Sequence, residues 1–123
     1  MTRIGTRISA DWLDRPADLK FLKQIGVDYV DVVLDMVPGY NEAGGRANRE
    51  GLHQVMEKLD DAGLKIERAN TSGTYYVNAF LGRPGGDREI ENLQINADLC
   101  GEAGLPMFGI QAFQVSTLYP FKE

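Results

Sequence analysis

The chain has 123 residues, of which 43% are hydrophobic and 25% are charged, a composition typical of one globular domain. Its formal charge of −5 and isoelectric point near 4.9 argue against a nucleic-acid partner, because polyanions are bound through clustered lysines and arginines. The sequence contains neither an apolar stretch of the roughly 18 residues that a membrane span needs nor the apolar segment of a secretion signal after Met1. We therefore expect a cytoplasmic protein without a membrane partner.

Strands and helices are predicted to alternate along the chain. The strands are expected at 3–8, 29–34, 64–69 and 107–111, and the helices at about 14–25, 49–61 and 87–103. A glycine follows each helix, at Gly26, Gly63 and Gly104, where it can take the left-handed conformation that ends a helix. Asp14 is the expected cap of the first helix, and Pro16 suits its first turn.

Each predicted helix has one apolar face that should pack on the sheet. These faces consist of Leu19, Leu22 and Ile25 in the first helix, Leu52, Val55, Met56 and Leu59 in the second, and Ile90, Leu93, Ala97 and Cys100 in the third. Cys100 is the one cysteine of the chain, so it is expected to be a packing residue.

The alternation favours parallel pairing, and about four parallel strands with three helices make half of a (β/α)8 barrel. The prediction is an α/β fold, a partial TIM barrel in which residues 1–123 form a single N-terminal half-barrel. A small doubly wound sheet is the alternative. A half-barrel would leave two sheet edges and one apolar face open, so we expect the chain to form a homo-oligomer, to aggregate or to require the missing C-terminal half.

Polar residues follow the predicted strands, at the end of the sheet where the active sites of parallel α/β proteins lie. The candidates for substrate binding are Arg7, Asp35, Arg68, Asn70 and Gln111, with Ser9 beside them. Arginine binds carboxylates through two hydrogen bonds, so this lining suits a small, hydroxylated anion. The long loop at 70–86 carries three aromatic residues, Tyr75, Tyr76 and Phe80, which either cover the pocket or pack the loop down.

Other features of the sequence are interpreted as structural. His53 lies on the polar face of the second helix and is expected to be a solvated surface residue. The glycines Gly82, Gly85 and Gly86 follow a loop rather than a strand, which favours a turn before the third helix over a phosphate-binding loop. The residues show no Ser/His/Asp set and no spacing typical of metal ligands, so no metal site is assigned to this chain.

One segment resembles a known family. The run from Leu81 to Asn92, Leu-Gly-Arg-Pro-Gly-Gly-Asp-Arg-Glu-Ile-Glu-Asn, and the later residues Leu99 and Ala103-Gly104-Leu105 are similar to mannonate dehydratases. That family belongs to the xylose-isomerase-like barrels, and the phrase from Gly63 to Asn70 also resembles this wider group. The chain departs from the family at Gly86, where the family has arginine, and at Leu93, where an aromatic residue is usual.

The resemblance implies a metal-dependent sugar-acid lyase that removes water from D-mannonate to give 2-keto-3-deoxygluconate. In such a parent a divalent metal, Mn or Fe, would polarise the substrate oxygens, and its ligands would come from later strands. We therefore expect this chain to bind no metal alone and to orient the sugar acid without catalysis. The alternatives are a fragment of a sugar isomerase or epimerase and a non-catalytic half-barrel that binds a sugar acid or a partner.

Overall fold

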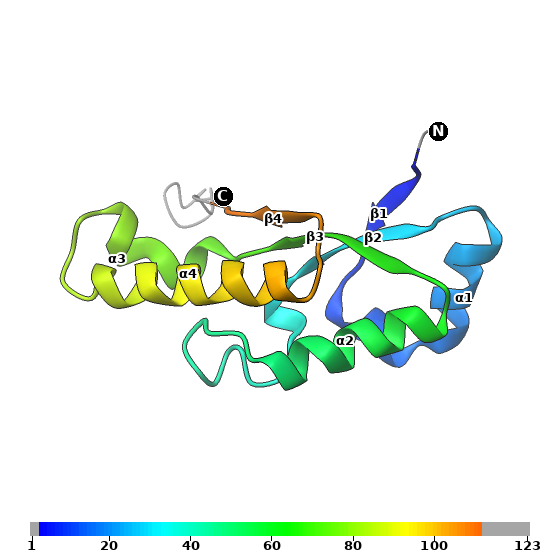
Figure 1. Cartoon of the computed structure of the whole chain (residues 1–123), viewed down its shortest axis with the longest axis horizontal. Helices are drawn as coiled ribbons and strands as arrows, with labels where there is room; N and C mark the ends of the chain where they lie inside the picture. Colours follow the sequence, from blue (N-terminus) through cyan, green and yellow to red (C-terminus); the bar gives the residue numbers. More distant parts are fainter. Residues whose placement is uncertain (1–2, 112–123) are drawn as a thin grey trace, which may run out of the picture.

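The computed structural model describes residues 3–111 and shows strands and helices in alternation (Figure 1). The strands of this part are β1 (Gly5–Arg7), β2 (Tyr29–Val33), β3 (Lys65–Asn70) and β4 (Met107–Gly109). Its α-helices are α1 (Pro16–Gln24), α2 (Arg49–Asp61), α3 (Val77–Phe80) and α4 (Gly86–Glu102). Three 3-10 helices lie in the connections, at Ala10–Asp14 (η1), Leu34–Met36 (η2) and Gly73–Tyr76 (η3). The prediction missed α3, which lies inside the loop expected at 70–86.

The four strands described form one parallel sheet in the order β1-β2-β3-β4. Helices α1, α2 and α4 lie on one side of this sheet (Figure 1). The predicted α/β class is therefore confirmed, and the arrangement matches a partial TIM-barrel-like fold. One irregularity interrupts the pairing, because the register of β2 and β3 shifts by a residue between Val30 and Asp31.

The core fills the space between the sheet and the helices. Val30 and Val32 of β2 and Ala69 of β3 are completely or almost completely buried on the helix side. The helices contribute Leu19 and Leu22 from α1, Leu52, Val55 and Leu59 from α2, and Cys100 from α4. Cys100 is thus a packing residue, as expected, and burial raises the pKa of its thiol to about 11.

The opposite face of the sheet is polar, not apolar as expected. The described part of the chain places no helix over this face, which carries Tyr29, Asp31, Arg68 and Asn70. The reason is the period-two alternation of strands: Val30 and Val32 point into the core, so the residues between them point away from it. The open face therefore exposes mainly polar and charged side chains, together with Val33 and Met107, rather than the continuous apolar surface that we expected.

Three predicted helix details are wrong. The N-cap of α1 is Arg15, which makes no side-chain cap hydrogen bond, so Asp14 is not the cap; Pro16 does occupy the first turn. Ile25 lies just beyond α1 and is 58% exposed. Of the face predicted for α4, Cys100 is buried in the core, whereas Ile90 is 45% exposed.

The buried face of α4 consists instead of Asn92, Asn96 and Cys100. These residues are four apart, so they lie on one side of the helix. Helix α2, in contrast, spans the predicted residues, with Gly63 in the left-handed conformation (φ 77°) just after it.

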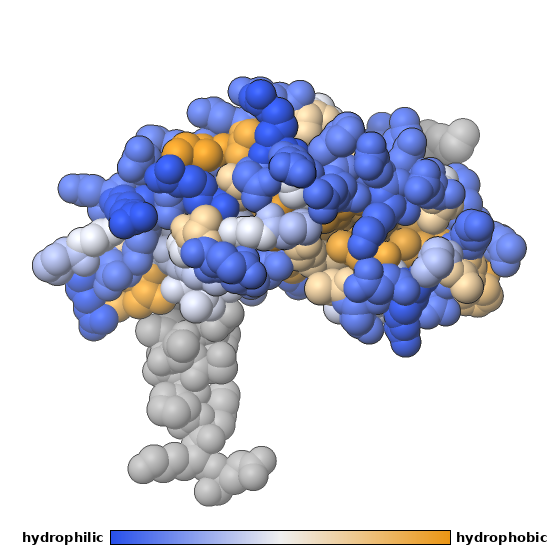
Figure 2. Space-filling model, turned by 90° about the horizontal axis from the view of Figure 1, so that it is seen from below, coloured by the Kyte–Doolittle hydropathy of each residue, from blue (hydrophilic) through white to orange (hydrophobic). Residues whose placement is uncertain are grey.

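The outer surface on the helix side is largely hydrophilic, with separate apolar patches (Figure 2). Within residues 3–111, the helices are too short or too polar for any of them to cross a lipid bilayer.

Candidate functional site

A row of side chains crosses the sheet on its open face. The strand register pairs Arg7 of β1 with Asp31 of β2, Asp31 with Arg68 of β3, and Arg68 with Met107 of β4. Neighbouring strands lie about 4.8 Å apart, so the Cα atoms of Arg7 and Arg68 are separated by about 10 Å. Two of the predicted binding residues are thus brought together, with a carboxylate between them.

Asp31 holds Arg68 in place. The Arg68 guanidinium donates two hydrogen bonds to Oδ2 of Asp31, from Nε at 3.1 Å and from Nη2 at 2.5 Å. This pairing neutralises most of the charge that Arg68 would otherwise present. Arg7 forms no ion pair with any of residues 3–111, so its charge remains available to a ligand.

Arg68 and Asn70 were expected after the third strand, but both belong to β3, whose last residue is Asn70. The Asn70 side chain lies against β4. A Cβ atom on Gly109 would lie 2.2 Å from Asn70 Oδ1, so Gly109 leaves the space that the amide occupies. The backbone N–H of Thr71 donates to the Gly109 carbonyl at 2.9 Å and fixes this end of the pair of strands.

The other predicted binding residues lie beyond the strand ends. Asp35 belongs to η2, which follows β2, and burial raises the pKa of its carboxyl above the ordinary value. Gln111 follows β4 and is exposed. Ser9 follows β1 and donates a hydrogen bond to Asp11, which lowers the pKa of that carboxyl.

The loops at the carboxyl ends of β2 and β3 are held by a buried polar network centred on Asn96 of α4. Asn96 Oδ1 accepts a hydrogen bond from the backbone N–H of Ala47 at 2.8 Å. Its Nδ2 donates to the Gly45 carbonyl at 2.9 Å and to the Tyr76 hydroxyl at 3.1 Å. The Tyr76 and Tyr40 hydroxyls lie 3.3 Å apart. One helix residue therefore joins the loop at 37–48 to the loop at 70–86.

Tyr75 is the aromatic residue that this network brings to the surface next to Asp35. Its ring meets Tyr40 edge-on, with centroids 5.4 Å apart, and its hydroxyl donates to Asn41 Oδ1 at 2.6 Å. Its pKa is raised by partial burial and by the negative charges of Asp35 and Glu42. The aromatic residues of the loop at 70–86 were expected either to cover a pocket or to pack the loop down. Tyr76 is buried and packs the loop down, whereas Tyr75 lies at the edge of an open hollow with Glu42, Thr74 and Arg88.

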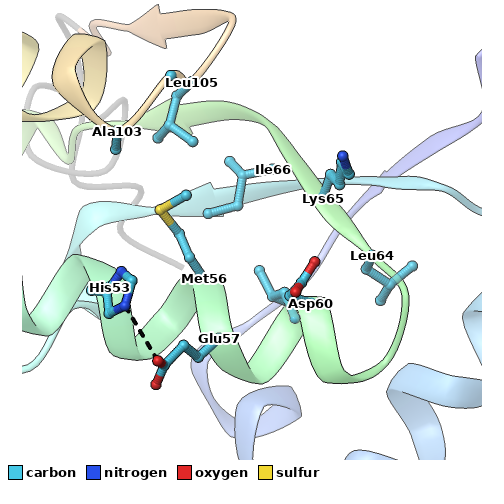
Figure 3. Close-up of a pocket in the computed structure, with 11 residues that line it drawn as sticks. His53, Met56, Glu57, Asp60, Leu64, Lys65, Ile66, Ala103 and Leu105 are labelled. Atoms are coloured by element: carbon cyan, nitrogen blue, oxygen red, sulfur yellow. Dashed lines mark ion pairs between the residues drawn. The ribbon is translucent and has the colours of Figure 1, made fainter.

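A separate cleft of about 390 Å³ lies on the other side of the sheet, between α2, the start of β3 and the end of α4 (Figure 3). Met56 points from α2 toward Ile66 and Ala103 in this cleft. The cleft is not continuous with the row on the open face, because the sheet lies between them. His53 borders it as an exposed side chain, with Nε2 3.2 Å from the Glu57 carboxylate, which agrees with a surface role.

The glycine-rich run at 82–86 forms a turn, as predicted. Gly82 and Gly85 take the left-handed conformation, with φ of 63° and 91°. Glu89, in the first turn of α4, accepts hydrogen bonds from the Ala79 N–H at 2.7 Å and from Asn78 Nδ2 at 2.9 Å. Glu89 thus joins the first turn of α4 to α3.

The described residues do not by themselves fit a resident metal ion. Among residues 3–111, no three His, Cys, Asp or Glu side chains come together in an arrangement that could hold one. Asp31 is the carboxylate within the candidate row, and its Oδ2 already accepts two hydrogen bonds from Arg68. No chemical step through a metal is therefore derived for this chain.

Sequence reasoning missed Asp31, Tyr40 and Asn96. The alternation of Tyr29, Asp31 and Val33 in the second strand was the signal that could have placed Asp31 on the open face. For Asn96, the spacing of four from Asn92 and Cys100 marked one side of a helix, but the sequence did not show that this side is buried.

No family model and no curated protein matches the sequence. The fold is similar to the crystal structure of mannonate dehydratase from Streptococcus suis serotype 2, with a TM-score of 0.67 and 19% identical residues. The similarity covers 91% of this chain and 30% of that chain. At this level of identity the likeness establishes a shared fold, and this chain spans less than a third of the length of the neighbour.

Proposed function

We propose that this chain is the N-terminal half-barrel of a metal-dependent sugar-acid lyase similar to mannonate dehydratase, and that it orients the substrate. The observation that carries the proposal is the likeness to mannonate dehydratase over 91% of the chain. It is supported by an open sheet face that presents a free arginine beside a paired one, a lining suited to a sugar carboxylate.

The residues take different roles in this proposal. Arg7 binds the carboxylate of the sugar acid, because its guanidinium is engaged in no ion pair with the described residues. Asn70 and Gln111 carry amide side chains at the carboxyl end of the sheet, and these amides form hydrogen bonds with the hydroxyl groups of the sugar acid. Arg68, whose guanidinium is held in one direction by Asp31, donates a further hydrogen bond to the substrate. Asp35, in η2 after β2, accepts a hydrogen bond from a substrate hydroxyl.

The reaction assigned to the parent removes water from D-mannonate to give 2-keto-3-deoxygluconate. When bound, a divalent ion such as Mn or Fe polarises substrate oxygens. The ligands of that ion belong to the rest of the proposed parent. The residues of this chain bind and orient the sugar acid.

The test is titration calorimetry of the chain with D-mannonate and with D-mannitol, each in the presence of Mn²⁺, together with an assay for 2-keto-3-deoxygluconate. We expect weak binding of mannonate, none of mannitol, which lacks the carboxylate, and no product. Arg7→Ala should abolish the binding, whereas Arg83→Ala, in the loop at 82–86, should retain it. Equal binding of both sugars, or a loss with both variants, would contradict the assignment of Arg7. Product formation would show that the chain alone holds a complete catalytic centre.

A further inference from the structure

The hollow bordered by Tyr75 lies between two loops and the start of α4. Its volume is about 520 Å³, within the range of small-molecule sites, about 300–1,000 Å³. One wall is the loop at 37–48, the second is η3, and the third is the start of α4. The loop at 37–48 lies beside α4 on the helix side of the sheet (Figure 1), so the hollow is separate from the row that contains Arg7.

Two buried asparagines of α4 hold these walls in place. Asn92 Oδ1 accepts a hydrogen bond at 2.8 Å from Nε of Arg46, in the loop at 37–48. Asn96, one turn further along the helix, is bonded to the same loop and to the hydroxyl of Tyr76 in η3. The hollow is therefore preformed, and a ligand would not have to order its walls on binding.

Two side chains of opposite charge face the hollow without pairing. Arg88 comes four residues before Asn92, so both lie on the side of α4 that lines the hollow. Glu42 lines the hollow from the loop at 37–48. Within residues 3–111, neither Arg88 nor Glu42 forms an ion pair, with each other or with another side chain. A ligand that carries both charges therefore fits between them.

The wall with Glu42 and Tyr75 is suited to a cation. The Tyr75 hydroxyl donates its hydrogen to Asn41, so the lone pairs of its oxygen remain available to another donor. Partial burial and the negative charges of Asp35 and Glu42 raise the pKa of this hydroxyl, so both carboxylates act on this wall of the hollow. An ammonium group is attracted by these charges and can also contact the face of the Tyr75 ring.

The wall with Arg88 is suited to a carboxylate. A guanidinium binds a carboxylate through two parallel hydrogen bonds. Glu89 is the other acidic residue that lines the hollow, and its two oxygens already accept hydrogen bonds from Asn78 Nδ2 and the Ala79 N–H. Arg88 is thus left to an anion that enters from solvent.

We propose that this hollow binds a free amino acid as its zwitterion. The carboxylate of the amino acid accepts hydrogen bonds from the Arg88 guanidinium, and its ammonium group lies against Glu42 and Tyr75. Gly44 borders the hollow, and a Cβ atom there would meet nothing within 4 Å, so the side chain of the ligand has room beside it. The proposal holds whether or not the chain binds a sugar acid, because the two sites use different residues.

Titration of the chain with L-alanine, ethylamine and propionate, followed by the NMR shifts of the backbone amides, tests the site. Ethylamine is alanine without the carboxylate, and propionate is alanine without the ammonium group. Each should bind at least about tenfold more weakly than alanine, because each loses one of the two charge contacts. The shifts should be largest at Gly44, Thr74 and Gly85, which line the hollow.

Arg88→Gln and Glu42→Gln separate the two ends of the ligand. Both side chains are exposed, so each variant should keep the circular dichroism spectrum of the parent chain. Alanine should bind Arg88→Gln no better than ethylamine does, and should bind Glu42→Gln no better than propionate does. Arg83→Gln and Glu50→Gln remove the same charges at exposed positions outside the hollow, and these controls should bind alanine as the parent chain does.

Three results would overturn the proposal. The first is a titration in which alanine does not shift the amides of the hollow. The second is equal binding of alanine, ethylamine and propionate, which would show that the two charges are not read together. The third is an equal loss of alanine binding in the variants and in their controls, which would show that the effect is not located in the hollow.

Discussion

Replacing Asn96 with alanine should cost more stability than any surface change on the same helix. The substitution removes three hydrogen bonds, from the Ala47 N–H and to the Gly45 carbonyl and the Tyr76 hydroxyl. Tyr76 keeps its contact with Tyr40, but the two backbone groups lose their partner, at about 1–3 kcal/mol each when buried. We expect a loss of about 3–5 kcal/mol, against about 5–15 kcal/mol for a whole domain.

Urea unfolding followed by circular dichroism measures this loss. The chain concentration is held constant, because association would add to the apparent stability. Gln94→Ala, at an exposed position of α4, is the matched control and should change the free energy of unfolding by less than about 0.5 kcal/mol. A loss for Asn96→Ala below about 1 kcal/mol, with an unchanged denaturant slope, would show that water satisfies these backbone groups and would refute the reasoning.

Three further predictions concern single side chains. Gly109→Ala should destabilise the fold by about 1–3 kcal/mol, because its Cβ would meet the Asn70 amide, whereas Gly101→Ala, in open space within α4, should stabilise it by about 0.5–1 kcal/mol; thermal unfolding separates the two. Cys100 should react with a thiol reagent at pH 8 no faster than the chain unfolds, since its pKa is raised to about 11, and rapid labelling of the native chain would contradict its burial. Burial raises the pKa of Asp35 in the folded state, so the charged carboxylate lowers the free energy of unfolding once the pH exceeds that pKa. Asp35→Asn should therefore stabilise the chain at pH 7, and this gain should vanish as the pH falls toward 3.8. An equal gain at pH 7 and at pH 3.8 would exclude this mechanism.

The sequence was sufficient for the parts of the fold that depend on local patterns. Helix α2 spans the predicted residues because its apolar positions repeat at helical spacing, its N-cap Asn48 accepts a hydrogen bond from the Gly51 N–H at 2.7 Å, and Gly63 follows it in a left-handed conformation. The order of elements fixed the parallel sheet, because strands joined by helices pair in parallel.

What the sequence did not show depends on contacts between distant segments. The polar face of α4 is buried because the loops at 37–48 and 70–86 supply hydrogen-bond partners for Asn96, a pairing that no local pattern encodes. Spacing assigned Ile90, Leu93, Ala97 and Cys100 of α4 to the core; Cys100 is buried there, whereas Ile90 is 45% exposed. An apolar stripe shows that a helix has a partner, but it does not show whether that partner is the sheet or a neighbouring helix.

The candidate site was predicted as a set of strand ends, and the structure changes what that set can do. Arg7 and Arg68 were expected to act alike as cations, but Asp31 lies between them in register and takes both hydrogen bonds from Arg68. The row therefore has one available positive charge instead of two, which fits a single carboxylate better than a doubly charged phosphate. Since Asp31 also fixes the direction of the Arg68 guanidinium, the same pairing that lowers the charge of the row makes its geometry more rigid.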